Sequence, residues 1–231
     1  DVYSNSTRDL LVKVPIPSLS GYLTQMQNVG RSSNKGIEFQ ISGTPVYNSN
    51  FTWNVNFNMS MNRNEVEDLG GQKSVLYQSG WGGSNAPFDY TVMVGQPVGA
   101  IWGLVNDGYY KIDDFDYEDG EYTLKEGIPS SQSVTATAPR PGSLKYVDVN
   151  GDSVVNDNDR TIIGIAAPKF FGGINQQFTY KNFDMSIFIN FQYGNKVLNA
   201  NKLEFTSGYT IHSNLLAEMN NRWRNVNEEG E

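Results

Sequence analysis

A strict two-residue alternation of apolar and polar side chains is the feature that most limits what this chain can fold into. Residues 37–45 alternate, and residues 51–62 repeat the pattern after a turn at 48–50. A period of two places alternate side chains on opposite faces of an extended strand. The sequence therefore predicts a hairpin over residues 36–62, with strands longer than the five or six residues that are common in soluble sheets.

Residues 170–193 predict a second long hairpin of the same design. Two alternating runs flank a two-residue turn at 181–182, which is a usual hairpin connection. Gln176 breaks the pattern on the apolar side and Phe188 breaks it on the polar side. The tail of one further strand is expected in residues 1–5.

Two folds accommodate such hairpins. In a soluble calcium-stabilised β-sandwich, a carbohydrate-binding or adhesin module, the apolar face forms the core and the polar face meets water. In an outer-membrane barrel the apolar face meets lipid and the polar face lines the lumen. Long strands, a polar face rich in Asn, Gln, Ser and Thr, and aromatic residues near the turns favour the barrel. The predicted fold class is all-β, part of a large antiparallel transmembrane β-barrel. Seven residues are predicted to line its lumen: Glu38, Gln40, Asn54, Asn56, Asn175, Gln177 and Asn190.

The spacing of the hairpins predicts how the chain is divided. Bacterial barrels have short periplasmic turns and long extracellular loops. The connection over 63–169 is far longer than an ordinary loop, so it should hold structure of its own or serve a function. We expect five segments: a strand end and extracellular loop in 1–35, a transmembrane hairpin in 36–62, a long extracellular region in 63–169, a second transmembrane hairpin in 170–193, and an extracellular loop with a short helix in 194–231.

The net charge of −8 is concentrated in one part of the long region. Between Asn106 and Arg160 lie 12 acidic and five basic residues, so seven of the eight net negative charges fall there. An acidic chain of this kind is not expected to bind nucleic acid. The absence of cysteine excludes disulfides, thiolate metal sites and cysteine nucleophiles. The single histidine, His212, supports no Ser–His–Asp triad, and we predict that the chain is not an enzyme.

Residues 148–159 carry oxygen ligands at the spacing of a calcium loop. Side-chain oxygens stand at positions 1, 3, 5, 9 and 12 of this segment, and position 7 can offer a backbone carbonyl. An Asx-rich turn without metal has similar residues. The helices and the glycine at position 6 of an EF-hand are missing. We predict a Ca²⁺ site with these ligands: Asp148, Asn150, Asp152, Val154, Asn156 and Asp159.

Exposed aromatic residues are candidates for contact with a substrate or a partner protein. Aromatic rings can stack on sugar rings, but they also pack inside a loop's own core. Apolar residues at helical spacing over 214–223 predict a short amphipathic helix that packs on a neighbouring loop or a partner. The candidates are Trp81, Trp102, Tyr109, Tyr110 and Trp223.

Several separated motifs together resemble the SusC/RagA family of TonB-dependent outer-membrane transporters. They occur in the family's order along nearly the whole chain. The segments that carry the resemblance are Asn28–Gly30, Asn34–Glu38, Val94–Gly99, Asp107–Tyr109, Pro141–Gly142, Asp148–Asp152, Asn156–Arg160, Ile163–Gly164, Pro168–Lys169, Tyr180–Asp184, Tyr193–Asn195 and Asn221–Trp223.

The resemblance implies a barrel of roughly 22 strands closed by an N-terminal plug. Members of the family import glycans or peptides with energy delivered by TonB, under a lid formed by a SusD-like surface lipoprotein. We expect this chain to be a fragment of the C-terminal half of such a barrel, without the plug. The resemblance therefore predicts an outer-membrane nutrient importer that contacts lipid, TonB through its N-terminal part, a SusD-like lipoprotein, and an oligosaccharide or peptide substrate.

Overall fold

The computed structural model describes residues 1–17, 19, 21–81, 87–208, 212 and 214–223. The chain forms two compact units. The first consists of Asp1–Gly80, Asn85–Ile101 and Gly164–Val197, and the second consists of Trp81–Ser84, Trp102–Ile163 and Leu198–Glu231. The predicted all-β fold class is confirmed, and each unit is described separately below.

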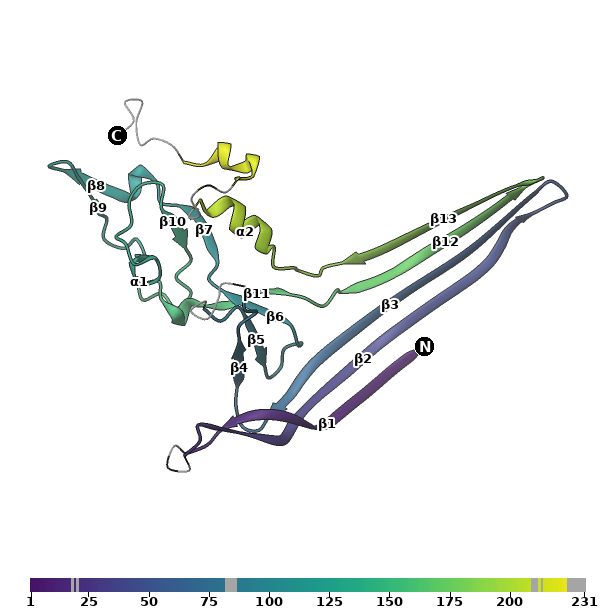
Figure 1. Ribbon diagram of the computed structural model, residues 1–231, viewed down its shortest axis with the longest axis horizontal. Coiled ribbons are helices and arrows are strands. Elements are labelled where there is room, and N and C mark those ends of the chain that lie inside the picture. The colour runs from purple at the N-terminus through teal and green to yellow at the C-terminus, as the bar shows by residue number, and fades with distance from the viewer. Residues whose placement is uncertain (18, 20, 82–86, 209–211, 213, 224–231) are drawn as a thin grey trace. The chain divides into compact units, whose positions relative to one another are not determined.

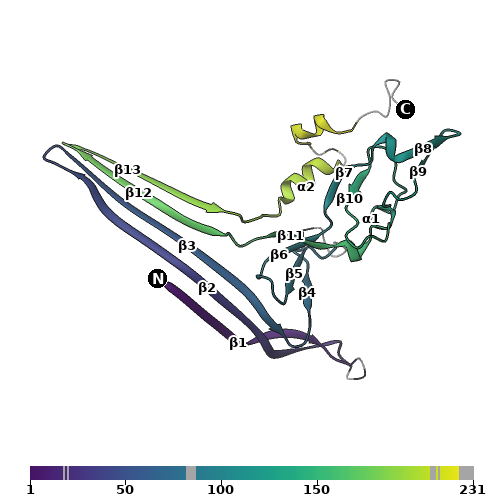
Figure 2. The same cartoon turned by 180° about the vertical axis from the view of Figure 1, so that it is seen from behind.

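The first unit is built on a five-stranded antiparallel sheet. Both predicted hairpins are present and pair directly with each other through β3 (Phe51–Leu69) and β12 (Phe170–Tyr180). Figures 1 and 2 show these four strands side by side, with both hairpin turns at the same end. The order across the sheet is β1 (Val2–Pro15), β2 (Thr24–Tyr47), β3 (Phe51–Leu69), β12 (Phe170–Tyr180) and β13 (Phe183–Tyr193).

Three strands extend further than the sequence predicts. β1 continues to Pro15 rather than ending near residue 5, β2 begins at Thr24 rather than at 36, and β3 ends at Leu69 rather than at 62. Cross-strand pairs such as Lys35 with Arg63 continue the ladder here. Polar residues occur on both faces of this extension. Neither face is therefore apolar enough to meet lipid. The alternation that reveals a strand is therefore lost while the backbone pairing persists.

One face of the sheet is apolar, and within the described residues much of it is open. The register places Ile41, Phe57, Ile174 and Ile189 in one row across four strands. Ile41 is 57% exposed and Ile189 is 49% exposed. A soluble sandwich would bury these side chains against a second sheet. The open face therefore supports the barrel interpretation, in which lipid covers it.

The height of the apolar face matches a membrane. From Phe51 to Met61 every second residue of β3 is apolar. Those ten steps span about 33 Å at about 3.3 Å each, and a tilt of about 45° leaves about 23 Å, close to the apolar band of outer-membrane barrels of about 25 Å. Trp53 stacks on Phe178 near the hairpin turns, with ring centroids 5.9 Å apart. Phe170 stacks on Tyr193 near the opposite end of the apolar band, with ring centroids 5.2 Å apart. Aromatic residues thus lie near both ends of the band.

Two glycines allow aromatic rings to lie flat on the sheet. A Cβ atom at Gly36 would overlap the Tyr3 ring, whose hydroxyl donates to Asn62 Oδ1 at 3.2 Å. A Cβ atom at Gly172 would overlap backbone atoms of β3 and lie against the Phe191 ring. Aromatic coverage of strand glycines restores packing that the missing side chain cannot give.

Short strands complete the first unit beyond the long hairpins. β4 (Ser74–Tyr77) pairs with β5 (Tyr90–Met93), and β5 pairs with the first two residues of β6 (Ala100–Gly103). Val12, Val66 and Leu69 form a small buried cluster. This cluster anchors the extensions of β1 and β3 beyond the apolar band.

The second unit contains two small antiparallel pairs and a buried aromatic core. Tyr110, Phe115 and Val155 are buried, and the Tyr110 and Phe115 rings meet edge to face at 5.9 Å. The predicted structure within 63–169 is therefore present. Its elements are β7 (Asn106–Tyr109) with β10 (Leu144–Tyr146), β8 (Phe115–Glu118) with β9 (Glu121–Leu124), the 3₁₀ helices η2 (Ile112–Asp114) and η3 (Asp157–Asp159), and α1 (Gln132–Thr135); β11 (Thr161–Ile165) then leads back into the first unit.

The helices of the C-terminal segment differ from the prediction. The helix expected over 214–223 is instead the 3₁₀ helix η4 (Ala217–Asn221), and an unpredicted helix α2 (Ala200–Ser207) precedes it. The Asn199 side chain caps α2 by accepting from the Lys202 amide at 2.9 Å. Lys202 also pairs with Glu218 at 2.7 Å. None of the helices in the described part of the chain has the length and apolarity needed to span a membrane.

We predict that Ile189→Arg destabilises the full-length protein by about 2–4 kcal/mol, because it places a charge on the lipid face near the middle of the apolar band. The measurement is the unfolding free energy of full-length protein folded in phospholipid vesicles, from denaturant titration. Asn190→Arg is the matched control, since the neighbouring residue lies on the polar face. Equal destabilisation by both variants would contradict the assignment of the two faces.

Candidate functional site

The sheet brings the seven predicted lumen residues onto one face. Cross-strand pairing aligns Asn54 with Gln177 and Asn56 with Asn175. Glu38 is paired with Ser60, Gln40 with Asn58, and Asn190 with Gly173. Paired residues in a sheet point to the same side. The polar residues of β2, β3, β12 and β13 therefore form one continuous polar face.

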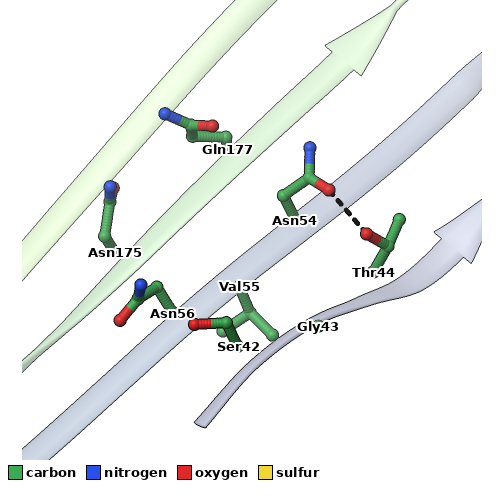
Figure 3. A pocket seen from close by; sticks show the side chains of 8 residues that line it. All are labelled: Ser42, Gly43, Thr44, Asn54, Val55, Asn56, Asn175 and Gln177. Carbon is green, nitrogen blue, oxygen red and sulfur yellow. Dashed lines mark hydrogen bonds between the residues drawn. The ribbon is translucent and has the colours of Figure 1, made fainter. Parts of the chain in front are cut away.

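A shallow pocket of about 490 Å³ lies on this face near the hairpin turns (Figure 3). It forms where β2 carries a bulge between Gly43 and Val46. Pro45 sits in this bulge, where the amide hydrogen that proline lacks is not needed for the ladder. The Thr44 hydroxyl donates to Asn54 Oδ1 at 2.8 Å, which fixes the amide of Asn54. The residues that line the pocket are Ser42, Gly43, Thr44, Asn54, Val55, Asn56, Asn175 and Gln177.

The chemistry of the pocket is that of uncharged hydrogen-bonding groups. Carboxamide side chains present both donors and acceptors, and hydroxyls can act as either. No acidic or basic side chain is among the residues that line it. Such a surface suits a neutral polar ligand, whose hydroxyl or amide groups it can pair. Ser42 and Thr44 also line this pocket, although the lumen prediction did not include them; their place in the alternation of β2 was the available signal.

Phe188 lies on the polar face, as the break in the alternation indicated. It is paired with Asn175 and is well exposed. Gln176 lies on the opposite, apolar face between Val55 and Ile187. The two exceptions are thus real departures from the two-faced design and not shifts in register.

In the acidic loop 148–159, the carboxylates are held by backbone amides. Asp148 accepts from the Gly151 amide at 2.6 Å and from the Ser153 amide at 2.7 Å. Asp152 accepts from the Val154 amide at 2.9 Å. The bond from Val154 to Asp152 closes an Asx turn, in which the side chain replaces a backbone acceptor, and the two bonds to Asp148 come from amides three and five residues along the chain. Together these hydrogen bonds fold the segment into a loop that is closed by its own side chains.

Asp159 is the centre of this loop. Its side chain is fully buried, and its oxygens accept from the amides of Val149 at 2.9 Å, Asn150 at 3.3 Å and Asn156 at 2.8 Å. The hydrogen bond from Asn156 is the main cause that lowers the pKa of Asp159; burial opposes it, and the other two amides add to the lowering. The carboxylate closes the two ends of the loop onto each other.

The predicted Ca²⁺ ligands fit the metal by chemical type. The loop supplies only hard oxygen donors, which Ca²⁺ prefers. Each carboxylate oxygen of Asp159 already accepts at least one backbone hydrogen bond, so a cation would share these oxygens with N–H groups. No cluster of three or more acidic or histidine side chains arranged for a metal occurs among the described residues. Amide and carbonyl oxygens would have to complete the coordination.

The aromatic candidates differ in how far they are available for contact. Tyr110 has no exposed surface, and its hydroxyl bridges Pro129 O at 2.6 Å and Ser131 Oγ at 2.8 Å. It therefore holds the interior of the second unit together and is not open to a ligand. Trp223 lies against the backbone of Gly142 and remains 40% exposed. Trp81 and Tyr109 are about half exposed, and Trp102 is partly buried.

Comparison with known proteins relates the chain to TonB-dependent receptors. It is 32% identical to the TonB-dependent receptor P3 of Formosa agariphila over 227 residues, which are 98% of this chain and 21% of that receptor. It is 28% identical to the TonB-dependent receptor SusC of Bacteroides thetaiotaomicron over 188 residues, 80% of this chain and 16% of that receptor. The chain thus spans about a fifth of the length of the curated relatives it matches. No family model matches it.

Solved structures show the same fold. A structure of the RagAB peptide transporter aligns with a TM-score of 0.66 at 18% identity and covers 99% of this chain and 22% of that chain. The RagAB peptide importer in an open-open state aligns with a TM-score of 0.59 at 21% identity over 89% of this chain and 19% of that chain. The fold of this chain is therefore that of one segment of a larger barrel.

We predict that the loop 148–159 loosens in acid because of Asp159. Because the pKa of Asp159 is lower in the folded protein than in the unfolded chain, its ionised form stabilises the fold. This stabilisation is complete above the ordinary aspartate pKa of about 3.9. It is lost as the pH falls through the lower pKa of the folded state. Protection of this segment's amides from hydrogen exchange in the full-length protein, taken relative to the intrinsic exchange rate at each pH, should therefore fall below about pH 3.9. Asp159→Asn should open the loop at every pH and remove that dependence. Asp157→Asn, which alters a carboxylate that is 85% exposed, should leave the dependence in place; the same response in both variants would contradict the assignment.

Proposed function

We propose that this chain is a segment of an outer-membrane TonB-dependent receptor of the SusC/RagA family, and that the whole protein imports nutrients across the bacterial outer membrane. The cargo is an oligosaccharide or another polar nutrient, peptides included. TonB supplies the energy for import, and the protein works together with a SusD-like surface lipoprotein. The chain contributes part of the barrel wall, and its role is in transport rather than catalysis.

The polar face of the sheet carries this proposal. Its rows of Asn, Gln, Ser and Thr run across four strands, with Glu38 and Asp184 as acidic members at opposite ends. A neutral amide or hydroxyl forms hydrogen bonds of similar free energy to water, to a sugar hydroxyl and to a peptide group. It can therefore replace a bond to water by a bond to a ligand at little cost. Between these two acidic residues, a ligand can therefore pass along the wall without a charge that would hold or repel it.

We predict that Gln177→Ala raises the half-saturating substrate concentration for uptake by about two- to tenfold. Loss of one hydrogen bond of about 0.5–1.5 kcal/mol to the passing ligand accounts for this range. The measurement is uptake of labelled oligosaccharides or peptides by cells that express the full-length protein. Uptake should stop in cells that lack TonB.

Gln176→Ala is the matched control for this experiment. It removes the same carboxamide from the adjacent position on the opposite face, and uptake should stay at the wild-type level. Both variants should still co-purify with a surface lipoprotein, which shows that the complex is intact. Equal effects of the two variants, or uptake without TonB, would contradict the proposed function.

We also propose that the loop 148–159 binds Ca²⁺ through Asp148, Asn150, Asp152, Asn156 and Asp159 with the carbonyl of Val154. The support is the hard-oxygen donor set and the closure of the loop onto itself through Asp159. The metal would neutralise part of the charge of an acidic region, and the loop's own residues would keep their backbone hydrogen bonds. Trp223, which retains an exposed edge, is the proposed contact for the lipoprotein.

Calorimetry on chelator-stripped full-length protein should detect Ca²⁺ binding with a dissociation constant on the order of 10⁻⁴–10⁻³ M, the range of extracellular modules. The double change Asp148→Asn with Asp152→Asn should abolish this binding event. Asp157→Asn, a carboxylate of the same loop outside the proposed ligand set, should retain it. Absence of heat in the wild-type protein, or heat unchanged by the double variant, would rule the site out.

A further inference from the structure

Two basic residues stand opposite each other where the apolar face ends. Lys35 of β2 is paired directly with Arg63 of β3, one alternate position beyond the apolar pair Ile37 and Met61. No register shift separates these two pairs, so all four side chains point to the lipid side. The basic pair thus lies at the end of the apolar band that is opposite the hairpin turns.

Like charges directly opposite each other destabilise a sheet. Both side chains are exposed, and neither forms an ion pair with any of the residues that the structure describes. Glu65 is the next acidic residue along this face of β3. It lies two positions beyond Arg63, opposite Ser33, and forms an ion pair with neither base. Lys35 and Arg63 therefore lack a counter-anion at the depth where the apolar band meets the lipid headgroups.

The surroundings of the pair identify the missing anion. The short hairpin turns mark the periplasmic end of a bacterial barrel, which places Lys35 and Arg63 at the outer leaflet. Phe170 and Tyr193 stack at the same end of β12 and β13, where aromatic rings sit at the depth of headgroups. An anion at this depth, beside hydrocarbon on one side and water on the other, is a phosphate carried by a lipid.

We propose that Lys35 and Arg63 bind the phosphate of a phosphorylated glycolipid in the outer leaflet of the membrane. The ammonium of Lys35 supplies a point charge, and the guanidinium of Arg63 can take two phosphate oxygens at once. The acyl chains of the same lipid lie on the apolar rows below the pair. The inference rests on the sheet being part of an outer-membrane barrel and not on what that barrel transports.

The test uses full-length protein in nanodiscs that contain either a phosphorylated glycolipid or the same lipid after phosphatase treatment. Native mass spectrometry measures the lipid retained on the protein. Wild-type protein should retain the phosphorylated form preferentially. Each of Lys35→Gln and Arg63→Gln should reduce retention about fivefold, and the double variant about 25-fold, as expected for the loss of one surface charge each.

Matched variants separate this site from general charge effects. Lys181→Gln, which removes an exposed base from a hairpin turn at the opposite end of the sheet, should leave retention unchanged. The exchange Lys35→Arg with Arg63→Lys should preserve it, because both charges remain. Unchanged retention in the double Gln variant, or loss of retention in the exchange variant, would overturn the proposal. Displacement of the glycolipid by inorganic phosphate at equal phosphate concentration would show a free-anion site instead and would also overturn it.

Discussion

The ladder of backbone hydrogen bonds that joins β2, β3, β12 and β13 is the constraint on which the rest of this structure depends. The hydrocarbon region of a membrane offers no partner for an N–H or C=O group, so each must be satisfied by the next strand. This requirement fixes the register of the four strands, and the register decides which side chains meet lipid. It also means that the outer edges of β1 and β13 need further strands, since an open sheet edge does not occur in lipid.

The alternation of side chains was readable from the sequence only where the two faces meet different solvents. Between Phe51 and Met61 one face meets lipid and the other water, so the period of two is plain and the hairpins could be predicted. Beyond Ile37, on the side away from the hairpin turns, polar residues such as Asn34 are mixed with the small buried cluster of Val12, Val66 and Leu69, and no face is apolar throughout. The backbone pairing of β2 with β3 continues there and is joined by side-chain bonds such as the one that Asn64 Nδ2 donates to Asn34 Oδ1 at 3.1 Å, but backbone pairing has no signature in side-chain type. The length of the strands beyond the band could therefore not be predicted.

The candidate sites show the same limit in a different form. The spacing of Asp148, Asp152 and Asp159 predicted a loop with oxygen ligands, but an Asx turn and a metal loop use the same residues. Only the coordinates show that Asp159 is buried and accepts from three backbone amides. The burial of Tyr110 was equally hidden, because an aromatic residue in a loop can pack inward or face a ligand. Helix α2 escaped prediction because its stability depends on the Asn199 cap and on a pair with the distant Glu218, not on an apolar stripe.

The near absence of charge on the polar face has a physical consequence for transport. A wall that binds a ligand strongly at one position would hold it there, so passage requires contacts that are favourable and individually weak. Amides such as Asn56 and Gln177 meet this condition, because each exchanges one hydrogen bond to water for one to the ligand at a net gain near 1 kcal/mol. The charge of the sheet is instead placed at the ends of the apolar band, in Lys35 and Arg63 at one end and Lys181 at the other. In the proposed importer, these fixed charges mark the two ends of the band that meets lipid, and the neutral groups between them let the cargo move past the wall.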